Sequence, residues 1–227
     1  MYAMRWRGTG PWVGDSRRER LLLTYIKARQ RDCLLNCNDG PPCDVPPMNS
    51  PDTIAYALHG NLYLNITNRC TLRCTFCPKF NGVWEVQGYD LRTHHEPSVA
   101  EILAAVGDPR GYREVVFCGL GEPMLRLYPL LEAAARLRSQ GARVRVNTDG
   151  LANLVYGRDV TPDLENNIDA LSISLNAQDE TTYNLHCRPT LAGAYAAVLD
   201  FARRARVFVP EVTLTAIDGL PGVDIAA

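Results

Sequence analysis

The sequence predicts an α/β fold in which a mostly parallel sheet curls into a barrel or partial barrel. From Thr53 onward, strand-like segments alternate with helix-like segments, which is typical of a parallel sheet. Right-handed crossovers between successive strands would curl such a sheet toward a barrel. The polar residues that could carry chemistry fall mostly at the carboxyl ends of the strands, where parallel α/β folds place their functional sites.

Five segments are expected to form strands, the first of them because its polar and apolar residues alternate. They are residues 61–67, 114–118, 143–147, 170–175 and 211–217. Helices are expected between them, over residues 98–106 and 128–140, from residue 161, and over 190–206. Ser98 and Glu101 form a capping box that opens the first helix. Pro162 stands near the start of the short third helix, where proline is tolerated.

The N-terminal part of the chain differs from the rest. Residues 1–51 are expected to form a poorly ordered, basic, Cys- and Pro-rich extension and linker, with a short helix over 19–30. Residues 52–227 are expected to form the core domain. Met48 lies just before that domain, and one hypothesis is that the natural protein starts there. A native peptide from upstream of Met48 would refute it.

Composition limits the classes of function. The net charge is −1, so there is no strong electrostatic case for nucleic acid or for an anionic membrane surface as a partner. No uninterrupted apolar run is long enough to span a bilayer. Eight cysteines in 227 residues do not suggest a secreted disulfide scaffold, and we expect a cytoplasmic protein. Cys33, Cys37 and Cys43 have no diagnostic spacing, and no defined function is expected for them.

A second group of cysteines carries the chemistry. Cys70, Cys74 and Cys77 follow the first strand directly, with the spacing Cys-x3-Cys-x2-Cys and Phe76 just before the last. Three closely spaced thiolates can hold three irons of a [4Fe–4S] cluster and leave the fourth iron open. A zinc site remains an alternative, because a histidine such as His59, His94 or His95 could add the fourth ligand that structural zinc requires.

This cysteine motif resembles that of the radical SAM enzymes. The resemblance implies that the open iron binds S-adenosylmethionine and that an electron from the cluster cleaves it to methionine and a 5′-deoxyadenosyl radical. It implies a reductant such as a flavodoxin or ferredoxin. It also implies a core of six βα units, of which this sequence lacks the last strand and its helix. We therefore expect a C-terminally truncated core with an unpaired edge strand.

The second strand runs into a turn that resembles the Gly-Gly-Glu-Pro motif of the same family. The turn consists of Gly119, Leu120, Gly121, Glu122 and Pro123, with leucine in place of the family's first glycine. By the resemblance, backbone and side-chain groups here accept the methionine ammonium group. Glycines allow close backbone approach. Taken alone, the pattern could also be an ordinary turn.

Two further strand ends offer polar side chains. Asn147 and Asp149 follow the third strand and could face the methionine carboxylate or a substrate, or could belong to a local Asp-Gly turn. Ser174 and Asn176 follow the fourth strand and are expected to share a face, because side chains alternate along a strand. In the family such residues contact the ribose or carboxylate of the cofactor. Arg188 is either a further contact or a surface residue.

Residues 53–224 resemble the TatD-associated radical SAM proteins more specifically. The matching runs surround the cysteine motif, the glycine turn, Asn147, Asn176 and the last predicted strand, which leads into residues 214–222. The resemblance implies a functional link to a TatD-type metal-dependent hydrolase, but no reaction and no substrate. Two other interpretations stay open: a zinc-binding or regulatory module, and an inactive fragment of a radical SAM protein. Fold and cofactor do not fix the substrate.

Overall fold

A seven-stranded sheet forms the centre of the molecule, in the strand order β1-β9-β8-β7-β6-β3-β2. The computed structural model describes residues 2–5 and 52–225. The strands are β1 (Tyr2–Arg5), β2 (Ala55–Leu58), β3 (Asn61–Leu64), β6 (Val115–Phe117), β7 (Val144–Thr148), β8 (Ala170–Ser174) and β9 (Glu211–Ala216). The predicted helix over 19–30, Met48 and the cysteines at 33, 37 and 43 lie outside the described residues.

The middle of the sheet is parallel, and its two edges are antiparallel. Strands β3, β6, β7, β8 and β9 pair in parallel, which confirms the predicted α/β class and all five predicted strands. Strand β2 is antiparallel to β3 and closes one edge. Strand β1 is antiparallel to β9 and closes the other. The expectation of an unpaired edge at β9 was wrong, because residues 2–5 supply a partner strand for its backbone.

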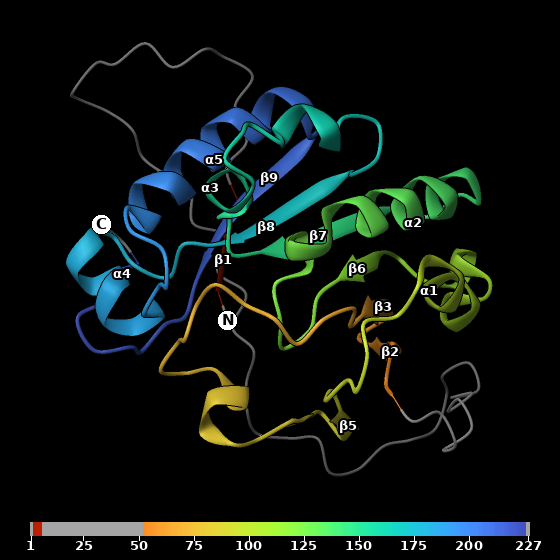
Figure 1. Cartoon of the computed structure of the whole chain (residues 1–227), viewed down its shortest axis with the longest axis horizontal. Helices are drawn as coiled ribbons and strands as arrows, with labels where there is room; N and C mark the ends of the chain where they lie inside the picture. The colour runs from red at the N-terminus through yellow and green to blue at the C-terminus, as the bar shows by residue number, and fades with distance from the viewer. Residues whose placement is uncertain (1, 6–51, 226–227) are drawn as a thin grey trace.

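Helices cover one side of the curved sheet (Figure 1). They are α1 (Val99–Val106), α2 (Leu127–Ser139), α3 (Ala152–Tyr156), α4 (Glu180–Cys187) and α5 (Ala194–Phe208). Phe117 of β6, Leu130 of α2 and Phe201 of α5 are completely buried between the two layers. Each such side chain contributes about 1.5–3 kcal/mol of transfer free energy, so these layers hold the strand ends in place.

The helix ends follow local sequence signals where those signals are strong. The Ser98 hydroxyl accepts the Glu101 amide at 3.3 Å, and the Glu101 carboxylate accepts the Ser98 amide at 2.8 Å, so the predicted capping box is present. The last helix begins at Ala194 rather than at residue 190, because Pro189 and Thr190 pair with the loop after β3. Helices α3 and α4, strand β2 and the β4–β5 hairpin (Glu85–Val86 and Tyr89–Asp90) were not predicted.

Within the part of the chain that the structure describes, no helix combines the length and the apolar composition needed to cross a membrane.

Candidate functional site

The loop that follows β3 carries Cys70, Cys74 and Cys77 on the side of the sheet away from α2 and α5 (Figure 1). All three are free thiols. Cys74 is buried, whereas Cys70 and Cys77 are half-buried. The Leu72 amide donates to the Cys70 sulfur at 3.4 Å, and the Cys77 amide donates to the Cys74 carbonyl at 3.1 Å. The loop therefore has a defined shape of its own.

A backbone ladder ties this cysteine loop to the end of α4. The Thr75 amide donates to the His186 carbonyl at 2.8 Å, and the Arg73 amide donates to the Cys187 carbonyl at 3.1 Å. The Thr190 amide donates to the Thr71 carbonyl at 2.9 Å. These bonds run antiparallel between the two segments, so the cysteine loop is held at both ends of its central stretch.

The glycine turn packs directly against the backbone of the same loop. A Cβ at Gly121 would lie 2.1 Å from the Thr67 carbonyl oxygen and 2.7 Å from that of Arg69. A Cβ at Gly119 would lie 2.2 Å from Oδ1 of Asn65. Gly121 is therefore required by close packing against backbone, a role that glycine alone can fill, whereas the nearest neighbour of Gly119 is a side-chain atom.

The Glu122 side chain connects the glycine turn to the end of β7 by hydrogen bonds inside the protein. Its buried carboxylate accepts the Met124 amide at 2.9 Å, the Thr148 hydroxyl at 2.8 Å and the Asp149 amide at 2.6 Å. It also caps the short helix Pro123–Arg126, in which Pro123 is the first residue and is buried. Both carboxylate oxygens are thus directed into the protein. A contact between this carboxylate and a cofactor ammonium group stays a prediction.

Asp149 links Glu122 to the cysteine loop. Its carboxylate accepts the Leu151 amide at 3.0 Å and the Thr71 hydroxyl. Burial raises the pKa of Glu122 well above its usual range, and the neighbouring Asp149 raises it further. Burial likewise raises the pKa of Asp149. Glu122 and Asp149 are therefore two neighbouring buried carboxyl groups, of which at most one ionises easily.

The same burial acts on the cysteines. Burial raises the pKa of Cys70 to about 12, helped by the negative charges of Asp149 and Glu122. The pKa of Cys74 is raised, first by its hydrogen bond to Cys187 and then by burial. In the metal-free chain these thiols keep their protons, and a metal would have to displace them.

Asn147 offers an unused acceptor at the end of β7. Its Oδ1 atom is buried and has no hydrogen-bond partner. The side chain also hydrogen-bonds Cys118, whose pKa burial raises to about 11. A buried acceptor without a donor is uncommon in native proteins. It is the kind of group that a ligand N–H or O–H would satisfy.

The neighbouring strands add hydroxyl groups on the same face as Asn147. The strand register places Asn147 beside Ser172, and Ser174 beside Thr215. Because register partners on parallel neighbours point to the same face, the structure brings Asn147, Ser172 and Ser174 together on the side of the sheet opposite the helices.

Asn176 does not follow the predicted alternation. Strand β8 ends at Ser174, and Asn176 has a left-handed backbone with a φ of 60°. Its amide donates to the Thr215 carbonyl at 3.0 Å, and its side-chain Nδ2 donates to the sulfur of Cys187 at 3.7 Å. The buried Asn176 side chain therefore points to Cys187 at the end of α4 and does not continue the alternation of β8. Arg188 is exposed at the end of α4.

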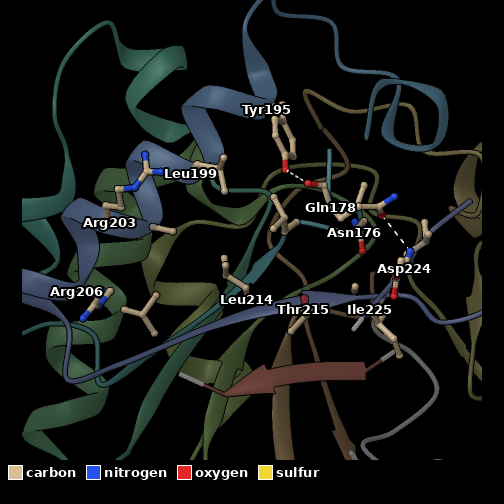
Figure 2. Close-up of a pocket in the computed structure, with 16 residues that line it drawn as sticks. Asn176, Gln178, Tyr195, Leu199, Arg203, Arg206, Leu214, Thr215, Asp224 and Ile225 are labelled. Atoms are coloured by element: carbon tan, nitrogen blue, oxygen red, sulfur yellow. Dashed lines mark hydrogen bonds between the residues drawn. The ribbon is translucent and has the colours of Figure 1, made fainter. Parts of the chain in front are cut away.

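A separate cavity of about 390 Å³ lies between α5 and β9 (Figure 2). Its lining is mostly apolar and includes Leu199 and Leu214, with Asn176 and Gln178 as polar members. Tyr195 donates to the Gln178 carbonyl at 2.6 Å across its rim. None of the three cysteines of the loop is among its lining residues, but Asn176, which bonds Cys187, is.

The described residues form no compact site for a single metal ion. Among the described residues, no three histidine, cysteine or acidic side chains converge closely enough to hold one metal ion. A [4Fe–4S] cluster requires a wider arrangement, because each cysteine binds a different iron. His94 and His95, which could have completed a zinc site, instead place their Nδ1 atoms 2.6 and 2.8 Å from the carboxylate of Asp52.

Two residues that sequence reasoning missed hold the cysteine loop. Thr71, inside the motif, bonds Asp149. Cys187 belongs to no cysteine motif in the sequence, yet it is completely buried against Cys74. No local pattern predicts these contacts, although a cysteine without a partner in a chain that holds a thiol cluster was a signal to follow.

Comparison with known proteins agrees with this geometry. The family model of the Radical SAM superfamily matches residues 64–226. A GTP 3′,8-cyclase of Corynebacterium glutamicum (strain R) is 29% identical over 171 residues, which are 73% of this chain and 44% of that protein. A probable dual-specificity RNA methyltransferase RlmN of Deinococcus deserti is 31% identical over 144 residues, 59% of this chain and 40% of that protein.

The chain thus spans less than half the length of these curated relatives. The solved structure of TYW1 with a lysine-pyruvate adduct bound has a TM-score of 0.42 and 17% identity, and the match covers 63% of this chain and 51% of that one. The family match covers the cysteine loop, the glycine turn and the ends of β7 and β8. The chain therefore belongs to the radical SAM superfamily, whose members use a [4Fe–4S] cluster and S-adenosylmethionine.

Proposed function

We propose that this protein is a radical SAM enzyme that holds a [4Fe–4S] cluster on Cys70, Cys74 and Cys77. The observation that carries the proposal is that one ordered loop at the carboxyl end of β3 presents all three thiols, within the family match. When bound, the cluster supplies an electron that cleaves S-adenosylmethionine to methionine and a 5′-deoxyadenosyl radical for hydrogen abstraction from a substrate.

Some residues around the loop make structural contacts within the protein, and others are proposed to bind the cofactor. Glu122 and Asp149 hold the glycine turn and the cysteine loop together, since their oxygens bond backbone and hydroxyl groups of the protein. Asn147 and Ser174 are the groups that we propose contact the cofactor, because Oδ1 of Asn147 is an unpaired buried acceptor and Ser174 shares its side of the sheet. Backbone atoms of Gly119 and Gly121 would complete the site on the other side of Asn147.

The reaction beyond radical formation stays unassigned. By their names, the two relatives act on different molecules, a nucleotide and an RNA. We therefore propose the radical-generating step without a substrate. We further propose a flavodoxin or ferredoxin as the electron donor, a cytoplasmic setting that keeps the thiols reduced, and a functional link to a TatD-type hydrolase. The last rests on the resemblance of residues 53–224 to the TatD-associated group.

The test is production of 5′-deoxyadenosine by anaerobically reconstituted protein with dithionite and S-adenosylmethionine. We expect product from the wild type and from Cys118→Ala, which removes a half-buried thiol outside the loop. We expect none from Cys70→Ala, with most of the fold retained. Product from Cys70→Ala at the wild-type rate would refute the cluster assignment. A cluster without product in the wild type would favour an inactive fragment.

A further inference from the structure

Cys187 is the only one of the described cysteines outside the loop that contacts a proposed cluster ligand. It is the last residue of α4 and has no exposed surface. Its thiol is hydrogen-bonded to that of Cys74, which is also buried. The two residues meet from segments far apart in the sequence, so the contact is a product of the fold.

The backbone ladder fixes this contact. Arg73, next to Cys74, donates its amide to the Cys187 carbonyl at 3.1 Å, and Thr75, on the other side of Cys74, donates to the His186 carbonyl at 2.8 Å. Side-chain Nδ2 of Asn176 donates to the Cys187 sulfur at 3.7 Å. Cys187 is thus held between Asn176 and Cys74, with little freedom to turn away.

The contact between the Cys74 and Cys187 sulfurs leaves one possible proton donor when Cys74 binds iron. A cysteine that ligates iron is a thiolate and has no proton to donate. If the two sulfurs stay in contact, only the thiol of Cys187 can supply the proton between them.

We propose that Cys187 is a positioning residue for the cluster: its S–H donates to the sulfur of Cys74 and stabilises the reduced cluster. The inference rests on the proposed function and goes beyond the three-cysteine motif. Hydrogen bonds to ligand sulfurs are among the factors that set the potential of an iron–sulfur cluster. A donor stabilises the more negative, reduced state, so its removal makes the cluster harder to reduce.

Potentiometric titration followed by EPR tests this directly. We compare reconstituted wild-type protein with Cys187→Ala, which removes the donor, and Cys187→Ser, which keeps an O–H donor. We expect Cys187→Ala to shift the midpoint potential to a more negative value and Cys187→Ser to restore most of the wild-type value. Cys118→Ala is the matched control and should leave the potential unchanged, because its thiol bonds Asn147. A wild-type potential in Cys187→Ala, at equal iron and sulfide content, would overturn the proposal.

A second measurement needs no cluster. Diamide oxidises two adjacent thiols to a disulfide and takes up both hydrogens itself, so metal-free protein treated with it reports which thiols touch. We expect a Cys74–Cys187 disulfide by peptide mapping. Cys74 paired only with Cys70 or Cys77 would refute the contact. If wild-type protein took up no cluster, the proposed function would fail, while the disulfide would still decide whether the two sulfurs meet.

Discussion

Gly121 illustrates how single residues determine the geometry of this site. A side chain there would meet two backbone carbonyl oxygens, of Thr67 and Arg69, and backbone cannot move aside as a flexible side chain can. The Glu122 amide also donates to the Arg69 carbonyl at 2.7 Å, so the turn and the cysteine loop are already in contact. The packing between these two segments thus depends on a missing Cβ.

We predict that Gly121→Ala destabilises the protein by about 1–3 kcal/mol, the usual cost of overpacking, because the new methyl group meets rigid backbone. Thermal unfolding by circular dichroism measures it. Gly111→Ala is the matched control, since a Cβ at Gly111 meets nothing within 4 Å. Equal melting temperatures for the two variants would show that the turn does not pack on the loop as described.

His95 gives the fold a pH-dependent contact. Its ring bonds Glu101 at 2.9 Å and Asp52 at 2.8 Å. The hydrogen bond to Glu101, and then that to Asp52, raise the pKa of His95 above its usual value. A group with a raised folded-state pKa stabilises the fold fully below its unfolded pKa, and this contribution disappears as the pH rises through the folded pKa.

We therefore predict that His95→Asn lowers the melting temperature at about pH 5, where the imidazole is charged, and has much less effect at about pH 8. His59→Asn is the control, because His59 lies on the turn between β2 and β3. An effect of His95→Asn that is equal at both pH values would contradict a charged contact and would indicate packing alone.

At the scale of elements, the capping box of α1 is the clearest link from sequence to structure. The Ser98 hydroxyl and the Glu101 carboxylate each accept the other residue's amide. We predict that Ser98→Ala costs about 1 kcal/mol, the typical value for a lost N-cap. In a protein of this size that lowers the melting temperature by roughly 2–4 °C.

Ser139→Ala is the control for this cap, because the Ser139 hydroxyl bonds only the Arg136 carbonyl at the far end of α2. An exposed change of that kind typically stays within about 0.5 kcal/mol. If both serine variants unfolded at the wild-type temperature, the box would contribute nothing measurable to the stability of α1.

The elements that could be predicted are those with local signals. Alternation predicted the first strand, the capping box predicted α1, and Pro162 predicted the short helix at Thr161. Helix α4 was missed because its sequence is polar and weakly periodic, although Asp179 caps it by accepting the Thr182 amide at 2.8 Å. Strand β2 was missed because four residues carry too little pattern, and its pairing with β3 decides its structure.

At the scale of the whole molecule, the sheet brings together groups that no local pattern connects. The sequence was sufficient to predict the cysteine loop and the strand-end residues Asn147 and Ser174. It could not predict that Glu122 points inward or that Cys187 meets Cys74, because both depend on packing between distant segments. The site therefore combines a loop that is evident in the sequence with supporting contacts that only the fold supplies.

The most direct test of the central claim is EPR of the anaerobically reconstituted, dithionite-reduced protein, recorded with and without S-adenosylmethionine. We predict a [4Fe–4S] signal that changes when S-adenosylmethionine is added, because three cysteine ligands leave one iron open to it. A cluster signal indifferent to S-adenosylmethionine would contradict the proposed cofactor site. Zinc bound without iron or labile sulfide would contradict the cluster itself.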